Sequence, residues 1–261
     1  MTPRGGALTA GAPDSLTQSL AVVIPAFNEA KTIAEVAGRA RKMAERVVVI
    51  DDGSTDGTLD CLTSLDVESR RHDRNLGKGE GILTGAEVAR EAGCALVVTL
   101  DADGQHPPET IPDLVACAEP RHIVIGARQA EADHVPRARY WANQTANFFV
   151  SWAAGHWIPD TQCGFRVYPV ELFEEVELSH RGGSGFVLES EILVEACRAG
   201  YRVKTVAIPA LYDSVLQRPS RYRPLHDSFA IGRMLASKLL KRWFFLSGLQ
   251  RALKERSAAK P

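Results

Sequence analysis

Short apolar runs alternate with helical patterns through the first half of this 261-residue chain. Runs of strand length cover residues 20–27, 46–50, 95–100 and 122–126, and residues 66–70 form a shorter candidate. The segments between them place apolar residues at helical spacing. Such alternation favours a mainly parallel sheet with helices on both faces, because each parallel crossover needs a helix. We therefore predict a single α/β domain.

The predicted strands end in polar residues. These ends are Asn28-Glu29, Asp51-Asp52, Asp101-Ala102-Asp103 and Ala127-Arg128. Open α/β sheets bind their ligands at the carboxyl ends of the strands. The sequence therefore predicts a binding site where these residues meet.

Asp101 and Asp103 are the leading candidates for metal binding. They lie two residues apart, so they point the same way from an extended segment, and Gln105 repeats the spacing with a neutral oxygen. Mg²⁺ or Mn²⁺ held by one or two carboxylates would keep its other positions for phosphate oxygens. The alternative interpretation is a solvated Asp-Ala-Asp-Gly turn.

Several classes of protein are disfavoured. The first predicted turn lacks the Gly-x-Gly-x-x-Gly pattern of a dinucleotide-binding crossover. Five scattered cysteines without a Cys-x-x-Cys pair indicate reduced thiols, neither a disulfide framework nor a zinc site. A net charge of -1 points to no particular partner, and we expect none among nucleic acids. Residues 1–18 are expected to be a disordered tail without a signal peptide, which favours a cytoplasmic protein.

Two cations near predicted strand or helix ends allow two interpretations each, and one segment is a candidate helix cap. Lys78 lies among glycines before a predicted helix and could help to hold a phosphate, or the segment could be a flexible turn. Arg128 could pair with a diphosphate or be an ordinary surface residue. Ser54, Thr55 or Asp56 is expected to cap the short helix that follows.

Six ordered motifs resemble those of the family 2 glycosyltransferases with the GT-A fold, in particular the branch typified by dolichyl-phosphate mannose synthase. The resemblance spans about residues 21–209. The motifs are Pro25–Glu29, Val49–Thr58, Asn75–Gly79, Asp101–His106, Asp160–Arg166 and Phe186–Glu191.

The resemblance implies an inverting transferase that takes its sugar from a UDP- or GDP-sugar. The Pro25–Glu29 loop and Asp52 would hold the base and ribose, and Asp101 and Asp103 would bind the diphosphate through Mg²⁺ or Mn²⁺, with Gln105 as a further ligand. The metal would act as a Lewis acid on the leaving nucleoside diphosphate. Together with the strand-end argument, the expected substrate-binding residues here are Pro25, Ala26, Phe27, Asn28, Glu29, Asp51, Asp52, Lys78, Asp101, Ala102 and Arg128.

The second half is expected to bind the acceptor. Arg137 and Arg139 open a predicted amphipathic helix over residues 135–154, where they could meet an anionic acceptor or simply be solvated. Arg218 and Arg221 lie in a proline-bounded loop that could receive a phosphate or be a solvated basic loop.

Glu189 and Glu191 are expected to open a helix over residues 186–199. In relatives that glycosylate a hydroxyl, an acidic residue near this position takes the acceptor's proton. An ionised phosphate acceptor needs no such base, so the two residues could instead be scaffold. We assign the candidate catalytic set as Asp103, Arg128, Glu189 and Glu191.

The chain ends in a predicted amphipathic helix from His226 onward. Its apolar stripe could lie in a membrane interface, cap the core or form a dimer contact. The stripe consists of Ile231, Leu235, Leu239, Trp243 and Leu246. Charges within the run argue against a helix that spans the membrane.

Three segments follow from this: a tail (1–18), a GT-A domain (19–224) and a C-terminal helix with its tail (225–261). The expected acceptor is a polyprenyl phosphate or another lipid, reached at the inner face of the cytoplasmic membrane. The alternatives are a hydroxyl acceptor and a nucleotide-sugar-binding protein without turnover.

Overall fold

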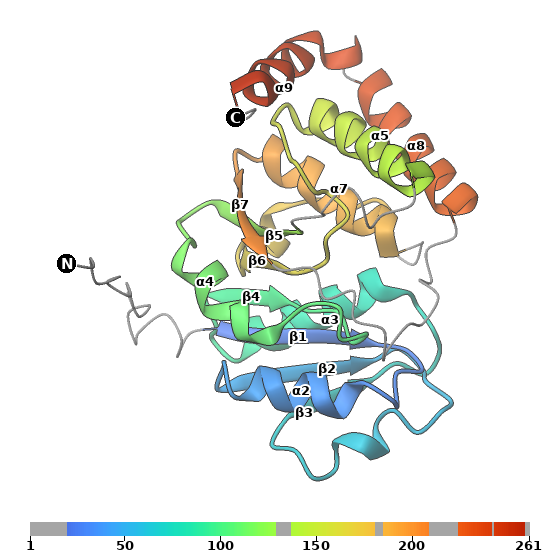
Figure 1. The fold of residues 1–261 in the computed structure, drawn as a ribbon, viewed down its shortest axis with the longest axis vertical. Coiled ribbons are helices and arrows are strands. Elements are labelled where there is room, and N and C mark those ends of the chain that lie inside the picture. Colours follow the sequence, from blue (N-terminus) through green and yellow to red (C-terminus); the bar gives the residue numbers. More distant parts are fainter. Residues whose placement is uncertain (1–19, 129–136, 181–184, 209–223, 242, 259–261) are drawn as a thin grey trace, which may run out of the picture.

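The computed structural model describes residues 20–128, 137–180, 185–208, 224–241 and 243–258. Within these ranges, seven strands form one sheet in the order β3-β2-β1-β4-β6-β5-β7 (Figure 1). The strands are β1 (Leu20–Ala26), β2 (Arg46–Asp51), β3 (Glu68–Arg71), β4 (Leu96–Thr99), β5 (His122–Arg128), β6 (Arg166–Pro169) and β7 (Arg202–Ile208).

Helices occupy the segments between the strands and most of the described C-terminal region. The α-helices are α2 (Ile33–Arg41), α3 (Lys78–Glu91), α4 (Ile111–Ala116), α5 (Arg137–Ala154), α6 (Leu172–Glu175), α7 (Gly185–Arg198), α8 (Pro224–Leu240) and α9 (Leu246–Ala258). Short 3-10 turns are η1 (Asp60–Leu62), η2 (Pro108–Thr110) and η4 (Trp243–Phe245).

The sheet is mainly parallel, as predicted. β1 pairs in parallel with β2 and β4, β2 with β3, and β5 with β7. Strand β6 is the exception, because it runs antiparallel to both β4 and β5. The carboxyl ends of β1, β2 and β4 therefore meet at one edge of the sheet, and the amino end of β6 joins them where Thr99 pairs with Arg166.

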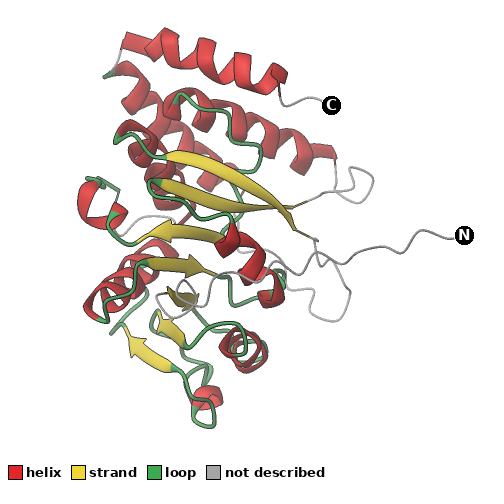
Figure 2. Ribbon diagram, turned by 90° about the vertical axis from the view of Figure 1, so that its left-hand side faces the viewer, coloured by secondary structure: helices red, strands yellow, loops and turns green. Residues whose placement is uncertain are grey.

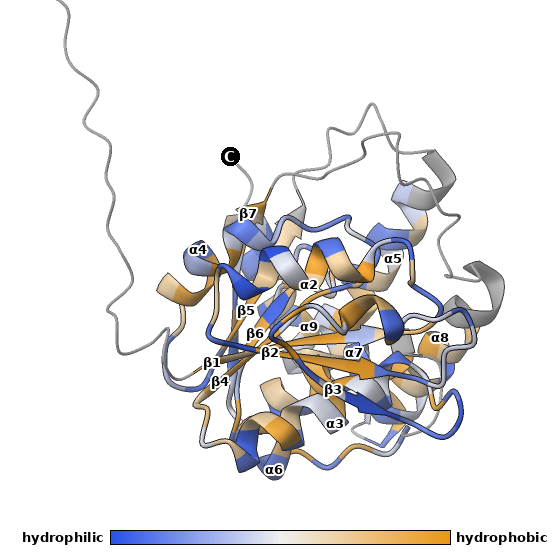
Figure 3. Ribbon diagram, turned by 90° about the horizontal axis from the view of Figure 1, so that it is seen from below, coloured by the Kyte–Doolittle hydropathy of each residue, from blue (hydrophilic) through white to orange (hydrophobic). Residues whose placement is uncertain are grey.

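Both faces of the sheet are covered by helices, which Figure 2 shows in side view. Helix α3 packs through Ala86 and Ala89 against a cluster that contains Val23 and Ile50. Helices α2 and α4 cover the opposite face, where Val22 lies in the main core. Burial on two sides explains why β1, β2 and β4 read as continuous apolar runs, seen as hydrophobic colouring in Figure 3. Each large apolar side chain contributes roughly 1.5–3 kcal/mol when fully buried.

Helices α5, α7, α8 and α9 pack against one another at the β7 end of the sheet (Figure 1). Ile231, Leu235 and Leu239 of α8 are buried in this layer, so they cap the core. The prediction that the same apolar stripe continues through Trp243 and Leu246 is wrong. The chain breaks at η4, where Trp243 has a left-handed backbone (φ 49°) and its side chain is 91% exposed. Leu246, at the start of α9, is exposed as well.

No helix among the described residues is long and apolar enough to cross a bilayer.

Two local predictions are corrected by the structure. Helix α7 begins at Gly185, so Glu189 and Glu191 lie in its second turn and not in its first. The short helix η1 begins only at Asp60 and has no side-chain cap. The carboxylate of Asp56 instead accepts hydrogen bonds from the backbone N–H of Ala30 and from Thr58, which joins two loops.

Candidate active site

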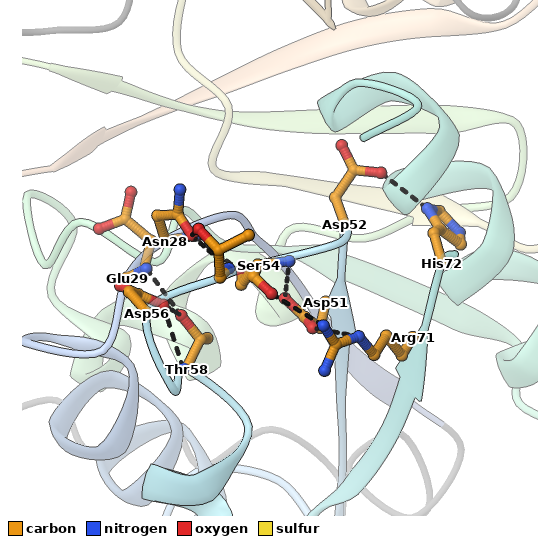
Figure 4. A network of polar contacts seen from close by, with 10 residues as sticks. Asn28, Glu29, Asp51, Asp52, Ser54, Asp56, Thr58, Arg71 and His72 are labelled. Carbon is orange, nitrogen blue, oxygen red and sulfur yellow. Dashed lines mark hydrogen bonds and ion pairs between the residues drawn. The ribbon is translucent and has the colours of Figure 1, made fainter. Parts of the chain in front are cut away.

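The loops after β1 and β2 are joined by reciprocal hydrogen bonds (Figure 4). The backbone N–H of Asn28 donates to Ser54 Oγ (2.8 Å), and the N–H of Thr55 donates to Asn28 Oδ1 (2.8 Å). The N–H of Glu29 donates to Thr58 Oγ1 (2.9 Å). Asn28 adopts a left-handed backbone (φ 55°), which Asn tolerates better than most residues. These contacts hold the two strand ends in a fixed relation.

The first predicted donor motif straddles the end of a strand. Pro25 and Ala26 are the last residues of β1 and are buried, whereas Phe27 and Asn28 are partly exposed and Glu29 is nearly buried. The side chains of Phe27 and Asn28 are therefore the ones that a ligand could reach. Their role in donor binding stays a prediction.

Asp52 positions the loop that leads into α3. Its Oδ1 accepts the N–H of Leu76 (2.8 Å), and its Oδ2 accepts the N–H of Gly77 (2.7 Å). His72 Nδ1 lies 2.8 Å from Oδ1 (Figure 4), and its Nε2 lies 2.9 Å from Thr84 Oγ1. Asp52 is buried, so a donor contact would add to this structural role. Such a contact stays a prediction.

Asp51 is also buried. Its Oδ1 accepts the N–H of Ser54 (3.1 Å), and its Oδ2 lies 3.5 Å from Arg71 Nε (Figure 4). These contacts fix the turn after β2. A role of Asp51 in substrate binding is untested.

Asp101 and Asp103 follow β4 and are both partly exposed. The backbone N–H of Gln105 donates to Asp103 Oδ1 (3.0 Å), while the Gln105 side chain is exposed and Ala102 is buried in the core. Burial and the negative charge of Asp101 raise the pKa of Asp103 to about 6. Two carboxylates that oppose each other's ionisation form a place where a cation would be stabilised.

The residues present fit a divalent cation that completes its coordination with phosphate. A side chain at Gly164 would place its Cβ 2.8 Å from Asp101 Oδ1, so the bare glycine keeps this carboxylate accessible. No cluster of three or more His, Cys, Asp or Glu residues able to hold a metal occurs among the described residues. The protein thus offers two carboxylates here, which is how Mg²⁺ is commonly held beside substrate phosphates.

Lys78, the first residue of α3, bridges two carboxylates. Its ammonium lies 2.6 Å from Asp101 Oδ1 and 2.7 Å from Glu189 Oε1. Burial opposes the charged form, but the charges of Asp101 and Glu189 outweigh it and raise the pKa of Lys78. The structure thereby brings together three predicted site residues, from the loop after β4, from α3 and from α7.

Arg166 is fully buried and fixes the loop before β6. Its guanidinium donates to the backbone oxygens of Cys163 (2.7 Å), Thr161 (2.9 Å) and Glu189 (3.0 Å), and also to Tyr168 Oη. An Arg at this depth needs such a set of acceptors. Arg166 therefore ties the loop to α7 at the residue whose carboxylate holds Lys78.

Glu191 lies on a different side of α7. It is buried and accepts hydrogen bonds from the N–H of Ser179 (3.2 Å) and His180 (2.9 Å), and Lys238 Nζ of α8 lies 2.7 Å away. Burial raises the pKa of Glu191, but hydrogen bonds from Lys238 and His180 outweigh it and lower the pKa overall. The contacts of Glu191 join α7 to α8.

The remaining predicted arginines are placed only in part. Arg128 ends β5 opposite Ile208. Arg137 and Arg139 open α5, and the structure does not describe their side chains. Arg218 and Arg221 lie outside the described residues. Their binding roles stay predictions.

Three residues of the site were not assigned from the sequence. Arg166 and His72 are described above. His106 is buried, with its Nε2 3.7 Å from Asp101 Oδ2 and its ring centroid 5.7 Å from that of Phe165. His106 and Arg166 both lie within motifs of the resemblance, Asp101–His106 and Asp160–Arg166, so their presence at the site could have been suspected; His72 has no comparable signal.

Comparison with known proteins finds a matching family profile and similar sequences. The sequence profile of glycosyl transferase family 2 matches residues 21–177. The polyprenol monophosphomannose synthase of Mycolicibacterium smegmatis is 30% identical over 204 residues, which cover 74% of this chain and 77% of that protein. The undecaprenyl-phosphate mannosyltransferase of Micrococcus luteus is 27% identical and covers 71% of this chain and 81% of its own length.

Solved structures share the fold. The mannosyl-3-phosphoglycerate synthase of Rubrobacter xylanophilus matches with a TM-score of 0.66 and 21% identity, over 87% of this chain and 76% of that one. The glucosyl-3-phosphoglycerate synthase of Mycobacterium tuberculosis, solved with Mn²⁺ and UDP, matches with a TM-score of 0.57 and 21% identity, over 86% and 80% of the two chains. At this level of identity the similarity shows a common architecture alone.

Proposed function

Because the chain belongs to glycosyl transferase family 2 and is a glycosyltransferase, we propose that it transfers a sugar from a nucleotide-sugar donor to a polyprenyl phosphate. The observation that carries the proposal is the pair Asp101 and Asp103 at the sheet edge where β1, β2 and β4 end. Asp101 and Asp103 would hold Mg²⁺ or Mn²⁺. A bound ion would supply Lewis-acid stabilisation of the leaving nucleoside diphosphate.

The loops of Asn28–Glu29 and residues 72–77 would enclose the nucleoside. The N–H groups of Asn28 and Glu29 donate to Ser54 and Thr58, and those of Leu76 and Gly77 donate to the carboxylate of Asp52, so both loops are held in place before a donor arrives. Preorganisation of this kind lowers the entropy that must be lost on binding. In this proposal Asp52 acts on donor affinity more than on the chemical step.

An acceptor that is already ionised suits the carboxylates of α7. Glu189 is 3% exposed and is ion-paired to Lys78, and Glu191 is held by Lys238 and the backbone of residues 179 and 180. A general base must reach the proton that it removes. Both carboxylates are buried and engaged. A phosphate oxygen can attack the anomeric carbon directly, with inversion, and this reaction needs neither carboxylate as a general base.

The C-terminal region offers a surface for peripheral attachment at the cytoplasmic face of a membrane. Around η4, the apolar side chains of Trp243, Phe244 and Leu246 are exposed. The turn is anchored from behind, because Trp152 Nε1 donates to the carbonyl oxygen of Phe244 (2.9 Å). Exposed Trp and Phe on a rigid support are typical of residues that enter a membrane interface.

Basic residues accompany this turn. Lys241 precedes it and is exposed, and the guanidinium of Arg251 lies 5.6 Å from the ring centroid of Phe245. Cations beside an apolar contact favour anionic lipids. The proposed surface would bring the enzyme to an acceptor that resides in the membrane.

The transfer is tested with UDP- and GDP-sugars, Mn²⁺, and undecaprenyl or dolichyl phosphate in detergent. We expect a lipid-linked sugar that forms only with the wild type and is lost in Asp101→Asn and in excess EDTA. Transfer to a water-soluble hydroxyl acceptor, abolished by Glu189→Gln, would overturn the phosphate acceptor. Donor binding without any turnover would overturn the enzymatic proposal.

Membrane attachment is tested by flotation with anionic vesicles. We expect the wild type to float at low salt and to be released at high salt, and Trp243→Ser with Phe244→Ser to abolish flotation. Neutral vesicles serve as the control for the charge contribution. Failure of the wild type to float, together with dimerisation that the same substitutions abolish, would assign this surface to a homodimer contact.

A further inference from the structure

Lys78 occupies an unusual position, because a single ammonium neutralises a proposed metal ligand and a buried carboxylate at once. We propose that Lys78 is a resident counter-cation that competes with the divalent ion for Asp101, and that Glu189 is the positioning residue that keeps the ammonium when Asp101 turns to the ion. The inference rests on the metal site of the proposed function. It assigns Glu189 a task other than that of a base.

The distances support a shared cation. Lys78 Nζ lies 2.6 Å from Asp101 Oδ1 and 2.7 Å from Glu189 Oε1, so neither carboxylate holds it alone. An ammonium has three donors and can serve two acceptors together. A divalent ion would bind the same carboxylate of Asp101 and would be repelled by the ammonium.

Glu189 is the fixed member of the pair. Arg166 binds its backbone oxygen at 3.0 Å, and the neighbouring Leu188 packs so closely on α3 that a Cβ at Gly79 would lie 2.5 Å from Leu188 Cδ2. Glu189 is 3% exposed, whereas Lys78 and Asp101 side chains are each 25% exposed. Lys78 and Asp101 therefore have room to separate, while Glu189 stays in place.

The direction of the exchange follows from burial. An unpaired carboxylate at the depth of Glu189 would be strongly destabilised, so the ammonium stays with it. The carboxylate of Asp101 is more exposed than that of Glu189, so its charge is destabilised less when a metal ion replaces the lysine. The consequence is that the site binds a divalent ion weakly by itself and binds it well when diphosphate oxygens provide further ligands.

The test measures Mn²⁺ binding by the EPR signal of free Mn²⁺, with metal alone and then with UDP or GDP. We expect Lys78→Met to bind Mn²⁺ about tenfold more tightly than the wild type without nucleotide, since a competing charge is removed. Glu189→Gln should bind Mn²⁺ several-fold more weakly, because Asp101 becomes the sole partner of the ammonium. Lys204→Met, which removes a lysine paired with Glu119, serves as the control and should bind as the wild type does.

The double variant Lys78→Met/Glu189→Gln separates competition from net charge. It loses one cation and one anion, so its formal charge equals that of the wild type, and no buried carboxylate is left unpaired. Competition predicts tighter Mn²⁺ binding than in the wild type, whereas net charge alone predicts equal binding. This variant also keeps the test valid if Lys78→Met does not fold.

Two outcomes would overturn the inference while leaving the metal site intact: equal Mn²⁺ affinity of the double variant and the wild type, or weaker binding by Lys78→Met. A wild type that binds no Mn²⁺ even with UDP and GDP would overturn the proposed metal site itself, and the inference with it. Tighter Mn²⁺ binding by Lys78→Met and by the double variant supports the exchange.

Discussion

Asp103→Asn is expected to make the metal-free protein more stable while it abolishes turnover. The pKa of Asp103 rises from 3.8 to about 6 on folding, through burial and the charge of Asp101. The ionised form is therefore disfavoured in the folded state. At about pH 7.5 this difference of roughly two units corresponds to about 3 kcal/mol, which Asn recovers because it has a similar shape and no charge.

The sign of the pH dependence follows from the raised pKa. Relative to a neutral side chain, the free-energy cost of the Asp103 charge is absent below the unfolded-state pKa of 3.8. It is fully present above the folded-state pKa of about 6. The advantage of Asp103→Asn should therefore fall to about half near pH 5 and vanish below about pH 4.

The assay is urea denaturation of both proteins in EDTA across this pH range, compared as the difference in the free energy of unfolding. Added Mn²⁺ should stabilise the wild type and leave the variant unchanged. A variant that is equally stable or less stable near pH 7.5, or a difference independent of pH, would refute the electrostatic reasoning.

Three further substitutions test the contacts around the site. Asp52→Asn should lower the free energy of unfolding by about 1–3 kcal/mol, because the NH₂ group of its amide would face a backbone N–H. It should also raise KM for the donor more than it lowers kcat, and a lower kcat alone would contradict the assignment. Gly164→Ala should weaken Mn²⁺ binding, since its Cβ would lie 2.8 Å from Asp101 Oδ1 and crowd the proposed metal ligand, whereas Gly232→Ala, with open space, should not; equal affinities would contradict the close approach. Lys238→Met should destabilise the fold by about 3–5 kcal/mol in thermal denaturation, because the buried carboxylate of Glu191 loses its lysine, against less than about 1 kcal/mol for Lys204→Met; similar losses would contradict this.

The central strands of the first half could be predicted because β1, β2 and β4 are buried on both faces and their apolar runs are continuous. The helix start at Gly185 was missed because Gly185 ends a Gly-Gly-Ser-Gly run, which reads as a loop. The break at Trp243 was missed because no Gly or Pro marks it, although the backbone there is left-handed. Such a turn depends on contacts with Trp152, which lies 91 positions away in sequence.

The candidate site was predictable where charges follow apolar runs, as at Asp101 and Asp103. It was not predictable where the contact depends on the path of distant segments. Arg166 begins β6 and is fully buried, although an arginine in a sequence normally indicates exposure. The bridge from Lys78 to Glu189 required the packing of α3 against α7, which no local pattern contains.

Strand β6 determines how the C-terminal half of this enzyme could be exchanged for that of a relative. It lies between β4 and β5 and runs antiparallel to both, while β5 pairs with β7 from His122 to Arg128. A chimera that replaced only the segment after β6 would set a foreign β7 against the native β5, and a slipped register would turn its side chains to the wrong face. The exchangeable unit therefore begins before His122, so that recombination between relatives would inherit β5, β6 and β7 together.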